Sequence, residues 1–270
     1  AWSLGPRIGR YDQGSQGAIP GHNLAIATLG GLILWFGWFG FNAGSSMAAD
    51  PAAASRIILT TNLSASTGAV AAAIVSWLAT SKPDLGMIIN GALAGLVSIT
   101  ASCAYVAPTS AIIIGFGGGM FAVFASGLFN RLQIDDPVGA LPVHLVGGIW
   151  GTLAVGLFSV GPGINPWHTE LSGPPLGFLI GGNIQPFLLQ LVGVATVAIF
   201  VSTTTLISWF ILQQAFGLRV SSHAESMGLD LSEHGLEAYP DFSQRVWPLN
   251  GFFPATSSTV TKPVAHTPEQ

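Results

Sequence analysis

The chain has 270 residues, of which 50% are hydrophobic and only 7% are charged, and its mean hydropathy is +0.59. Soluble domains carry about 25% charged residues, so this composition excludes an ordinary soluble protein and indicates an integral membrane protein. The formal net charge is −4 and the sequence has no basic stripe, which argues against a nucleic-acid partner. The single cysteine, Cys103, leaves no pair for a disulfide within these residues and no cysteine-based metal site.

Charge-free runs separated by polar loops predict about six membrane-spanning helices, because each span needs about 20 apolar residues. Nine of the twenty charged residues lie from Arg219 onward, so few of them interrupt the preceding part of the chain. We divide the long uncharged run 85–130 at Pro108, because proline disfavours helix at the residue before it. We therefore expect an all-α, polytopic membrane helix bundle over residues 1–216, with spans at about 24–41, 57–80, 85–105, 109–129, 138–159 and 187–216.

The basic residues predict the orientation of these spans. If each span reverses the direction of the chain, seven of the eight Lys and Arg residues fall on one side and only Arg56 falls on the other. Cytoplasmic loops carry the excess of positive charge, so both ends of the chain should be cytoplasmic. Residues 217–270, which are much more polar, should then form a cytoplasmic C-terminal tail.

His144 is the most conspicuous polar residue of the predicted spans, because residues 137–169 contain no Asp, Glu, Lys or Arg. An ionisable side chain within a membrane span is a functional candidate by default. The alternative is that His144 only hydrogen-bonds a neighbouring helix. Gly148 and Gly151 follow at i+4 and i+7, so we expect them on the same helical face, where they would let another backbone approach.

The end of the first predicted span carries a second candidate site. Trp38, Phe41 and Ser45 lie at i, i+3 and i+7, which places them on one helical face. Aromatic faces with a hydroxyl group can hold a small cation, although aromatic residues at this depth can equally form an interfacial belt. Thr100 of the third span joins these residues as a pore candidate, with an interhelical hydrogen bond as the more ordinary role. No predicted span contains a carboxylate, which argues against a proton-relay pump.

Ser45 and His144 could also be the nucleophile and the base of an intramembrane hydrolase. The string Asn-Ala-Gly-Ser-Ser around Ser45 resembles the Gly-x-Ser-x-Gly elbow only loosely, and we identify no third group to orient the histidine. We therefore expect the protein not to be an enzyme, and to use neither a metal nor a cofactor.

Several long strings together resemble the Amt branch of the Amt/Rh/Mep ammonium transporter family. They are Gly37-Trp-Phe-Gly-Phe-Asn-Ala-Gly-Ser45, Asn90-Gly-Ala-Leu-Ala-Gly-Leu96, Asp135-Asp-Pro, His144-Leu-Val-Gly-Gly-Ile-Trp-Gly151 and Gly217-Leu-Arg-Val…Gly228-Leu-Asp…Glu233-His-Gly…Ala238-Tyr239. Members of that family have eleven spans, and this chain resembles the last six. The resemblance implies half of an ammonium-transporter-like fold, within a longer polypeptide that assembles as a homotrimer.

The resemblance also implies roles for individual residues. Phe41 and Ser45 match the outer site that recruits ammonium, or its analogue methylammonium, and Trp38 matches a residue that lines the conduction path. His144 matches the second member of a pair of pore histidines. Residues of the tail match the region that contacts neighbouring subunits and, in many members, PII-type signalling proteins: Gly217, Arg219, Gly228, Asp230, His234, Gly235 and Tyr239.

The expected function is therefore transport of ammonium or ammonia across a cell membrane. An ammonium ion that enters hydrocarbon loses a large hydration energy, so aromatic residues and a serine are suited to hold it at the rim. A path without carboxylates, lined by a neutral histidine that can exchange a proton, suits ammonia. The alternative function is an ammonium sensor that signals through its cytoplasmic tail.

Overall fold

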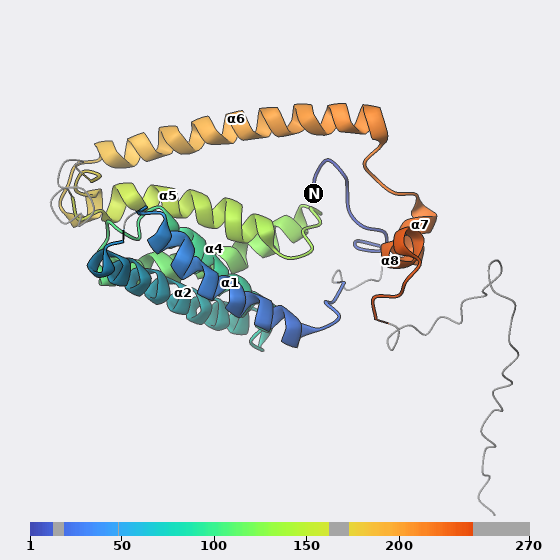
Figure 1. The fold of residues 1–270 in the computed structure, drawn as a ribbon, viewed down its shortest axis with the longest axis horizontal. Coiled ribbons are helices and arrows are strands. Elements are labelled where there is room, and N and C mark those ends of the chain that lie inside the picture. The colour runs from blue at the N-terminus through green and yellow to red at the C-terminus, as the bar shows by residue number, and fades with distance from the viewer. Residues whose placement is uncertain (13–18, 48, 162–172, 240–270) are drawn as a thin grey trace, which may run out of the picture. The chain divides into compact units, whose positions relative to one another are not determined.

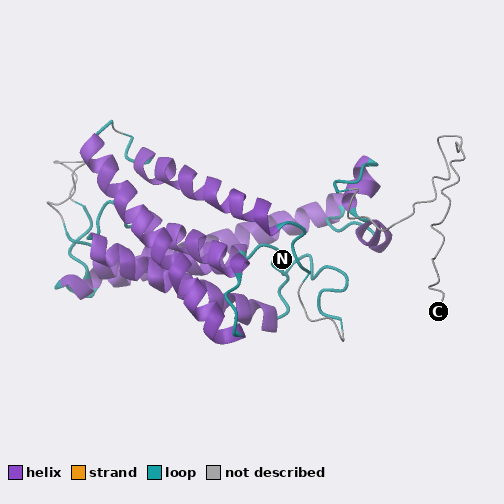
Figure 2. Ribbon diagram, turned by 90° about the horizontal axis from the view of Figure 1, so that it is seen from below, coloured by secondary structure: helices purple, strands orange, loops and turns teal. Residues whose placement is uncertain are grey.

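The computed structural model describes residues 1–12, 19–47, 49–161 and 173–239, and these residues form helices and connecting loops (Figure 2). They divide into two compact units, residues 1–220 and a second unit that begins at Ser221. The first unit contains α1 (Leu24–Gly44), α2 (Pro51–Thr80), α3 (Leu85–Thr100), α4 (Pro108–Arg131), a π-helical turn η1 (Leu141–Val146), α5 (Gly147–Phe158), a 3₁₀ turn η2 (Phe178–Ile180) and α6 (Gln185–Phe216). The second contains α7 (Ser222–Met227) and α8 (Leu229–His234).

Five of the described helical segments are long and apolar enough to cross a membrane: α1, α2, α4, the continuous η1–α5 segment and α6. The expectation of an all-α membrane helix bundle is confirmed. The third expected span is shorter than the predicted 85–105, because α3 ends at Thr100. Tight turns follow, in which Ser102 N–H donates to the Ile99 carbonyl and Tyr105 N–H donates to the Ser102 carbonyl. The 16 residues of α3 extend for about 24 Å, which is less than the roughly 30 Å hydrocarbon core.

Polar residues at the helix starts determine where several helices begin. Asp50 accepts hydrogen bonds from the backbone N–H groups of Ala52 and Ala53, and Pro51 occupies the first helical position. Helix α2 therefore begins six residues before the predicted 57, because the Asp50–Pro51 pair is an N-cap followed by the proline that such caps favour. Asp84 caps α3 in the same way by accepting from Met87 N–H at 2.9 Å.

Helices α2, α3 and α4 form the centre of the first unit, and they contact one another through small residues. Gly95 of α3 lies against α2, where the Ser64 hydroxyl donates to its carbonyl oxygen at 2.7 Å. A Cβ atom at Gly95 would clash with the Ser64 carbonyl oxygen, so only glycine allows this approach. Such close backbone packing holds membrane helices together where hydrophobicity cannot. The large side chains buried in this core include Leu96, Ile99 and Ile114.

The remaining helices of the first unit surround this centre. Helix α1 packs on α2 and α3, whereas η1 and α5 pack on α3 and α4. Helix α6 runs along α5 and is mostly exposed along its length (Figure 1). The pore candidates that the sequence singled out lie on α1, α3 and η1, and the packing of α3 against both α1 and η1 positions them.

Candidate functional site

Trp38, Phe41 and Ser45 lie together at the C-terminal end of α1. The rings of Trp38 and Phe41 meet edge to face, with centroids 5.7 Å apart and planes at 65°. The Ser45 hydroxyl donates to the Phe41 carbonyl oxygen at 2.6 Å, and Ser45 also caps the helix. Phe41 is 58% exposed and Ser45 is exposed, so both can be reached from outside the unit. A helix C-terminus carries partial negative charge, and with an aromatic ring beside it this end of α1 suits a small cation.

Thr100 joins Trp38 to α3. The Trp38 indole Nε1–H donates to Thr100 Oγ1 at 2.9 Å, and the Thr100 hydroxyl in turn donates to the Leu96 carbonyl at 2.7 Å. The structure thus brings Trp38, Phe41, Ser45 and Thr100 together across two helices. The interhelical hydrogen bond expected for Thr100 is present. A hydroxyl oxygen has two lone pairs, so Thr100 retains one further acceptor position.

Asn42 is a residue of this region that the sequence analysis did not single out. It is only 4% exposed and is the buried residue of α1, and its Nδ2 donates to Thr61 Oγ1 of α2 at 2.9 Å. Its Oδ1 is buried and has no partner among the described residues. Asn42 follows Trp38 at i+4, so an amide within an apolar span was the signal that could have identified it.

His144 lies within η1, where the helix is wider than an α-helix. The Gly147 N–H reaches the Pro142 carbonyl five residues back, which is the π-helical hydrogen bond. The His144 side chain is exposed on the surface of the unit. The expected approach of another backbone is present at Gly151, which is buried against the Ser98 backbone of α3, but nothing lies within 4 Å of a Cβ added at Gly148. His144 does not share the buried face of Gly151, because its side chain is exposed. The prediction assumed a regular helical period, and the wide turn rotates His144 away from that face.

The loop before η1 is anchored by a polar network from the first residues of the chain. Arg7 donates to Asp135 through Nε (2.7 Å), Nη2 (2.9 Å) and its backbone N–H (2.9 Å), and Arg10 Nε lies 3.4 Å from Asp135. The Asp135 side chain is only 3% exposed. The hydrogen bond from Arg7 is the main reason that the pKa of Asp135 falls from 3.8 to about 2, against a smaller opposing effect of burial.

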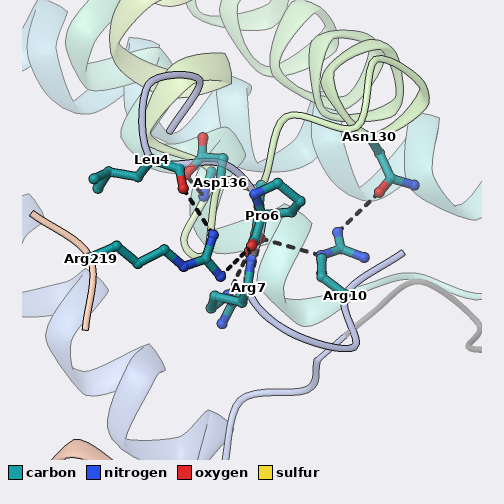
Figure 3. A network of polar contacts seen from close by, with 9 residues as sticks. Leu4, Pro6, Arg7, Arg10, Asn130, Asp136 and Arg219 are labelled. Atoms are coloured by element: carbon teal, nitrogen blue, oxygen red, sulfur yellow. Dashed lines mark hydrogen bonds and ion pairs between the residues drawn. The ribbon is translucent and has the colours of Figure 1, made fainter. Parts of the chain in front are cut away.

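Three further hydrogen bonds extend this network (Figure 3). Arg219, which the sequence assigned to the regulatory tail, donates from Nη1 to the Leu4 carbonyl (2.9 Å) and from Nη2 to the Pro6 carbonyl (2.8 Å). Arg10 Nη2 donates to Asn130 Oδ1 at the end of α4 (3.0 Å). Arg219 therefore belongs to the first unit and holds the segment that carries Arg7. Gly217 ends α6 with a positive φ of 69°.

The second unit holds the other tail candidates that the structure describes. Gly228 (φ 100°) separates α7 from α8, and Gly235 (φ 66°) ends α8 directly after His234. Asp230 accepts from the Ala238 N–H at 3.0 Å, which is the main reason that the pKa of Asp230 is lowered. Tyr239 is exposed. The rest of the predicted tail, residues 240–270, lies outside the described residues.

Comparison with known proteins places this arrangement in a family. Residues 1–239 match the model of the Ammonium Transporter Family. Among similar proteins, ammonium transporter Amt2 of Archaeoglobus fulgidus is 45% identical over 240 residues, which cover 88% of this chain and 51% of that protein. Ammonium transporter 3 of Dictyostelium discoideum is 38% identical, over 87% of this chain and 56% of that protein.

Solved structures agree with this assignment. A protein named Sensor Amt Protein is similar with a TM-score of 0.75 and 35% identity, over 85% of this chain and 54% of that one. Saccharomyces cerevisiae Mep2 is similar with a TM-score of 0.69 and 28% identity, over 75% of this chain and 45% of that one. The chain spans about half the length of the relatives that it matches, and those relatives are named as transporters, not enzymes. The chain therefore belongs to the ammonium transporter family, as a multi-pass membrane protein.

Proposed function

We propose that this chain takes part in the transport of ammonium or ammonia across a cell membrane. The observation that carries the proposal is the exposed group at the end of α1, in which Phe41, Ser45 and the Trp38 ring lie together. Family membership supports the choice of ammonium among small cations. The group offers an aromatic face, a hydroxyl oxygen and a helix C-terminus, which can replace part of the hydration that the ion loses.

In this proposal the conduction path for ammonium or ammonia continues from this group past Thr100 toward η1, because α3 packs on both α1 and η1. Thr100 offers the free lone pair of its hydroxyl oxygen to a passing N–H group. His144, exposed on η1, can accept or return a proton as the species passes. These steps let the ion give up its charge before the apolar part of the path, where a bare cation is strongly disfavoured.

The proposal includes an orientation and partners. Seven of the eight Lys and Arg residues lie on one side of the alternating spans, which supports cytoplasmic positions for both ends of the chain. We propose assembly as a homotrimer, and a role for the tail as a contact site for neighbouring subunits or a PII-type signalling protein. The division between a transmembrane part, 1–216, and the tail from 217 onward belongs to the same proposal.

Uptake of radiolabelled methylammonium by cells that express the complete gene product containing this chain tests the proposal. Phe41→Ala should weaken the apparent affinity by roughly 30-fold at most, because a desolvated cation–π contact contributes about 2 kcal/mol. Ser45→Ala should weaken it by removing the hydroxyl oxygen. Phe36→Ala and Ser46→Ala are matched controls, since Phe36 packs on Phe39 and the Ser46 hydroxyl bonds the Ala43 carbonyl. Equal uptake kinetics in all four variants would assign Phe41 and Ser45 to an interfacial belt.

A sensor is a second candidate function, because the similar solved structure quoted above is named Sensor Amt Protein. His144→Ala separates the two functions. Loss of methylammonium uptake together with loss of nitrogen-dependent signalling supports transport as the primary function. Lost uptake with retained signalling supports the sensor.

A further inference from the structure

The orientation of His144 depends on the width of a single turn. In η1 the backbone hydrogen bond closes over five residues instead of four, and π-helical turns of this kind are rare and occur often at functional sites. The wide turn separates His144, which is exposed, from Gly151, which is buried against Ser98. A regular α-helix through this segment would rotate His144 toward the side that α3 occupies.

Asp136 holds the start of this turn. Its Oδ1 accepts from the N–H groups of Gly139 and Ala140, each at 3.0 Å, and its Oδ2 accepts from Leu141 N–H at 2.7 Å. An ordinary N-cap side chain bonds the N–H groups two or three residues ahead. The bonds of Asp136 reach three to five residues ahead, so they satisfy the N–H groups that a wide first turn leaves free.

The backbone that carries Asp136 is itself fixed from two sides. The preceding residue, Asp135, is held by Arg7 and Arg10 in a position that is almost completely buried. On the other side, Gly139 has a φ of 77° and lies against the Asn90 side chain of α3, which leaves no room for a Cβ atom. The segment that carries Asp136 therefore has contacts outside η1 on both sides, which hold its carboxylate at the start of the turn.

We propose that Asp136 is a positioning residue that keeps η1 wide and so fixes the direction of the His144 imidazole. That the direction of the His144 side chain matters for transport rests on the proposed function. That Asp136 fixes this direction does not. Without Asp136, the three N–H groups lose a charged acceptor, and the turn is free to tighten into the α-helix that continues from Gly147. His144 then rotates, while residues farther along α5 stay in place because Gly151 is packed against α3.

Thiol labelling tests this difference directly. In the complete gene product with its native cysteines replaced, His144→Cys reports on the turn, and Ile149→Cys reports on the exposed side of α5 one turn later. The modification rates of the two thiols by a small methanethiosulfonate are measured with and without Asp136→Ala. The expected result is a severalfold change in the ratio of the two rates. General loosening of the helix would change both rates together and leave the ratio constant.

Asp50→Ala is the matched control, because Asp50 caps α2 through two backbone N–H groups and lies far along the chain from η1. It should leave the ratio unchanged. If the Asp136→Ala protein is not recovered, Asp136→Asn is used instead, because it keeps an oxygen acceptor without the charge. Asp136→Asn should change the ratio of the two modification rates in the same direction as expected for Asp136→Ala, but by less. An unchanged ratio in a folded Asp136 variant overturns the positioning role.

Methylammonium uptake separates this inference from the proposed function. If Asp136 positions His144 for transport, Asp136→Ala lowers the maximal rate per molecule by up to about 100-fold, the cost that a 1 Å misplacement of a reacting group can have. The apparent affinity should stay the same, because the group at the end of α1 is untouched. The labelling ratio could change while neither His144→Ala nor Asp136→Ala affects uptake. That result would confirm the positioning role of Asp136 and overturn the function proposed for His144.

Discussion

Replacing Thr100 by valine should destabilise the first unit, although the two side chains have nearly the same size. The Trp38 Nε1–H would lose its acceptor, and the intrahelical bond from Thr100 to the Leu96 carbonyl would also disappear. A buried donor without a partner costs about 1–3 kcal/mol, and the half-buried indole should fall in this range. Thr100→Ser, which keeps the hydroxyl, should recover most of the loss.

A double-mutant cycle isolates the hydrogen bond itself. Trp38→Phe removes the donor, so the double variant Trp38→Phe/Thr100→Val leaves neither partner unpaired. We expect the double variant to be less destabilised than the sum of the single variants, by about 0.5–1.5 kcal/mol. Thr196→Val is the control, since the exposed Thr196 hydroxyl donates within its own helix, to the Val192 carbonyl. Its effect should stay within about 0.5 kcal/mol.

The measurement is equilibrium unfolding of the complete gene product in mixed micelles with increasing SDS, followed by circular dichroism. Each variant is also assayed for methylammonium uptake per molecule. Single-variant effects that add to the double-variant effect within about 0.5 kcal/mol would refute the reasoning, because independent sites behave in that way. The hydrogen bond between α1 and α3 would then contribute nothing to the fold.

Two further predictions concern stability. Gly95→Ala should cost about 1–3 kcal/mol, because the added Cβ forces Ser64 and α2 away, whereas Gly30→Ala, where a Cβ meets nothing within 4 Å, should be neutral or stabilising in the same SDS titration. The Arg7–Asp135 pair should make stability pH-dependent. The pKa of Asp135 is lowered in the folded chain, so its contribution is complete above pH 3.8 and is lost as the pH falls toward about 2. Asp135→Asn should remove this part of the acid sensitivity, and an unchanged acid transition in that variant would contradict the assignment.

Much of the bundle could be predicted from the sequence, because charged residues are excluded from the hydrocarbon core and therefore separate the spans. Two errors concern the bounds of the spans, where the same residues are compatible with two structures. Asp50 indicates a loop by its charge, but its carboxylate also begins α2 as an N-cap. The apolar residues after Thr100 suggest a longer third span, but they form tight turns before Pro108.

The grouping of site residues on one helix could be predicted from their spacing, but contacts between residues on different helices could not. The spacing of Trp38, Phe41 and Ser45 indicates a shared face, and the structure groups them at the end of α1. The bond from Trp38 to Thr100 depends on how α1 and α3 are rotated against each other, which contacts among small residues determine. The position of His144 depends on a π-helical turn, and a pattern analysis based on a constant period cannot detect it.

The network at the first residues of the chain implies an order of assembly during synthesis. Arg7 and Asp135 are 128 residues apart, so at about 5–20 residues per second the arginine emerges roughly 6–25 s before its partner. Asp136 and the turn that it caps follow within a few residues, so the turn of His144 can be anchored before α6 has been made. The contact from Arg219 to the Leu4 carbonyl spans 215 residues and can form only afterwards. During synthesis, the turn that contains His144 can therefore form first, and the Arg219 contacts that support the Arg7 segment form last.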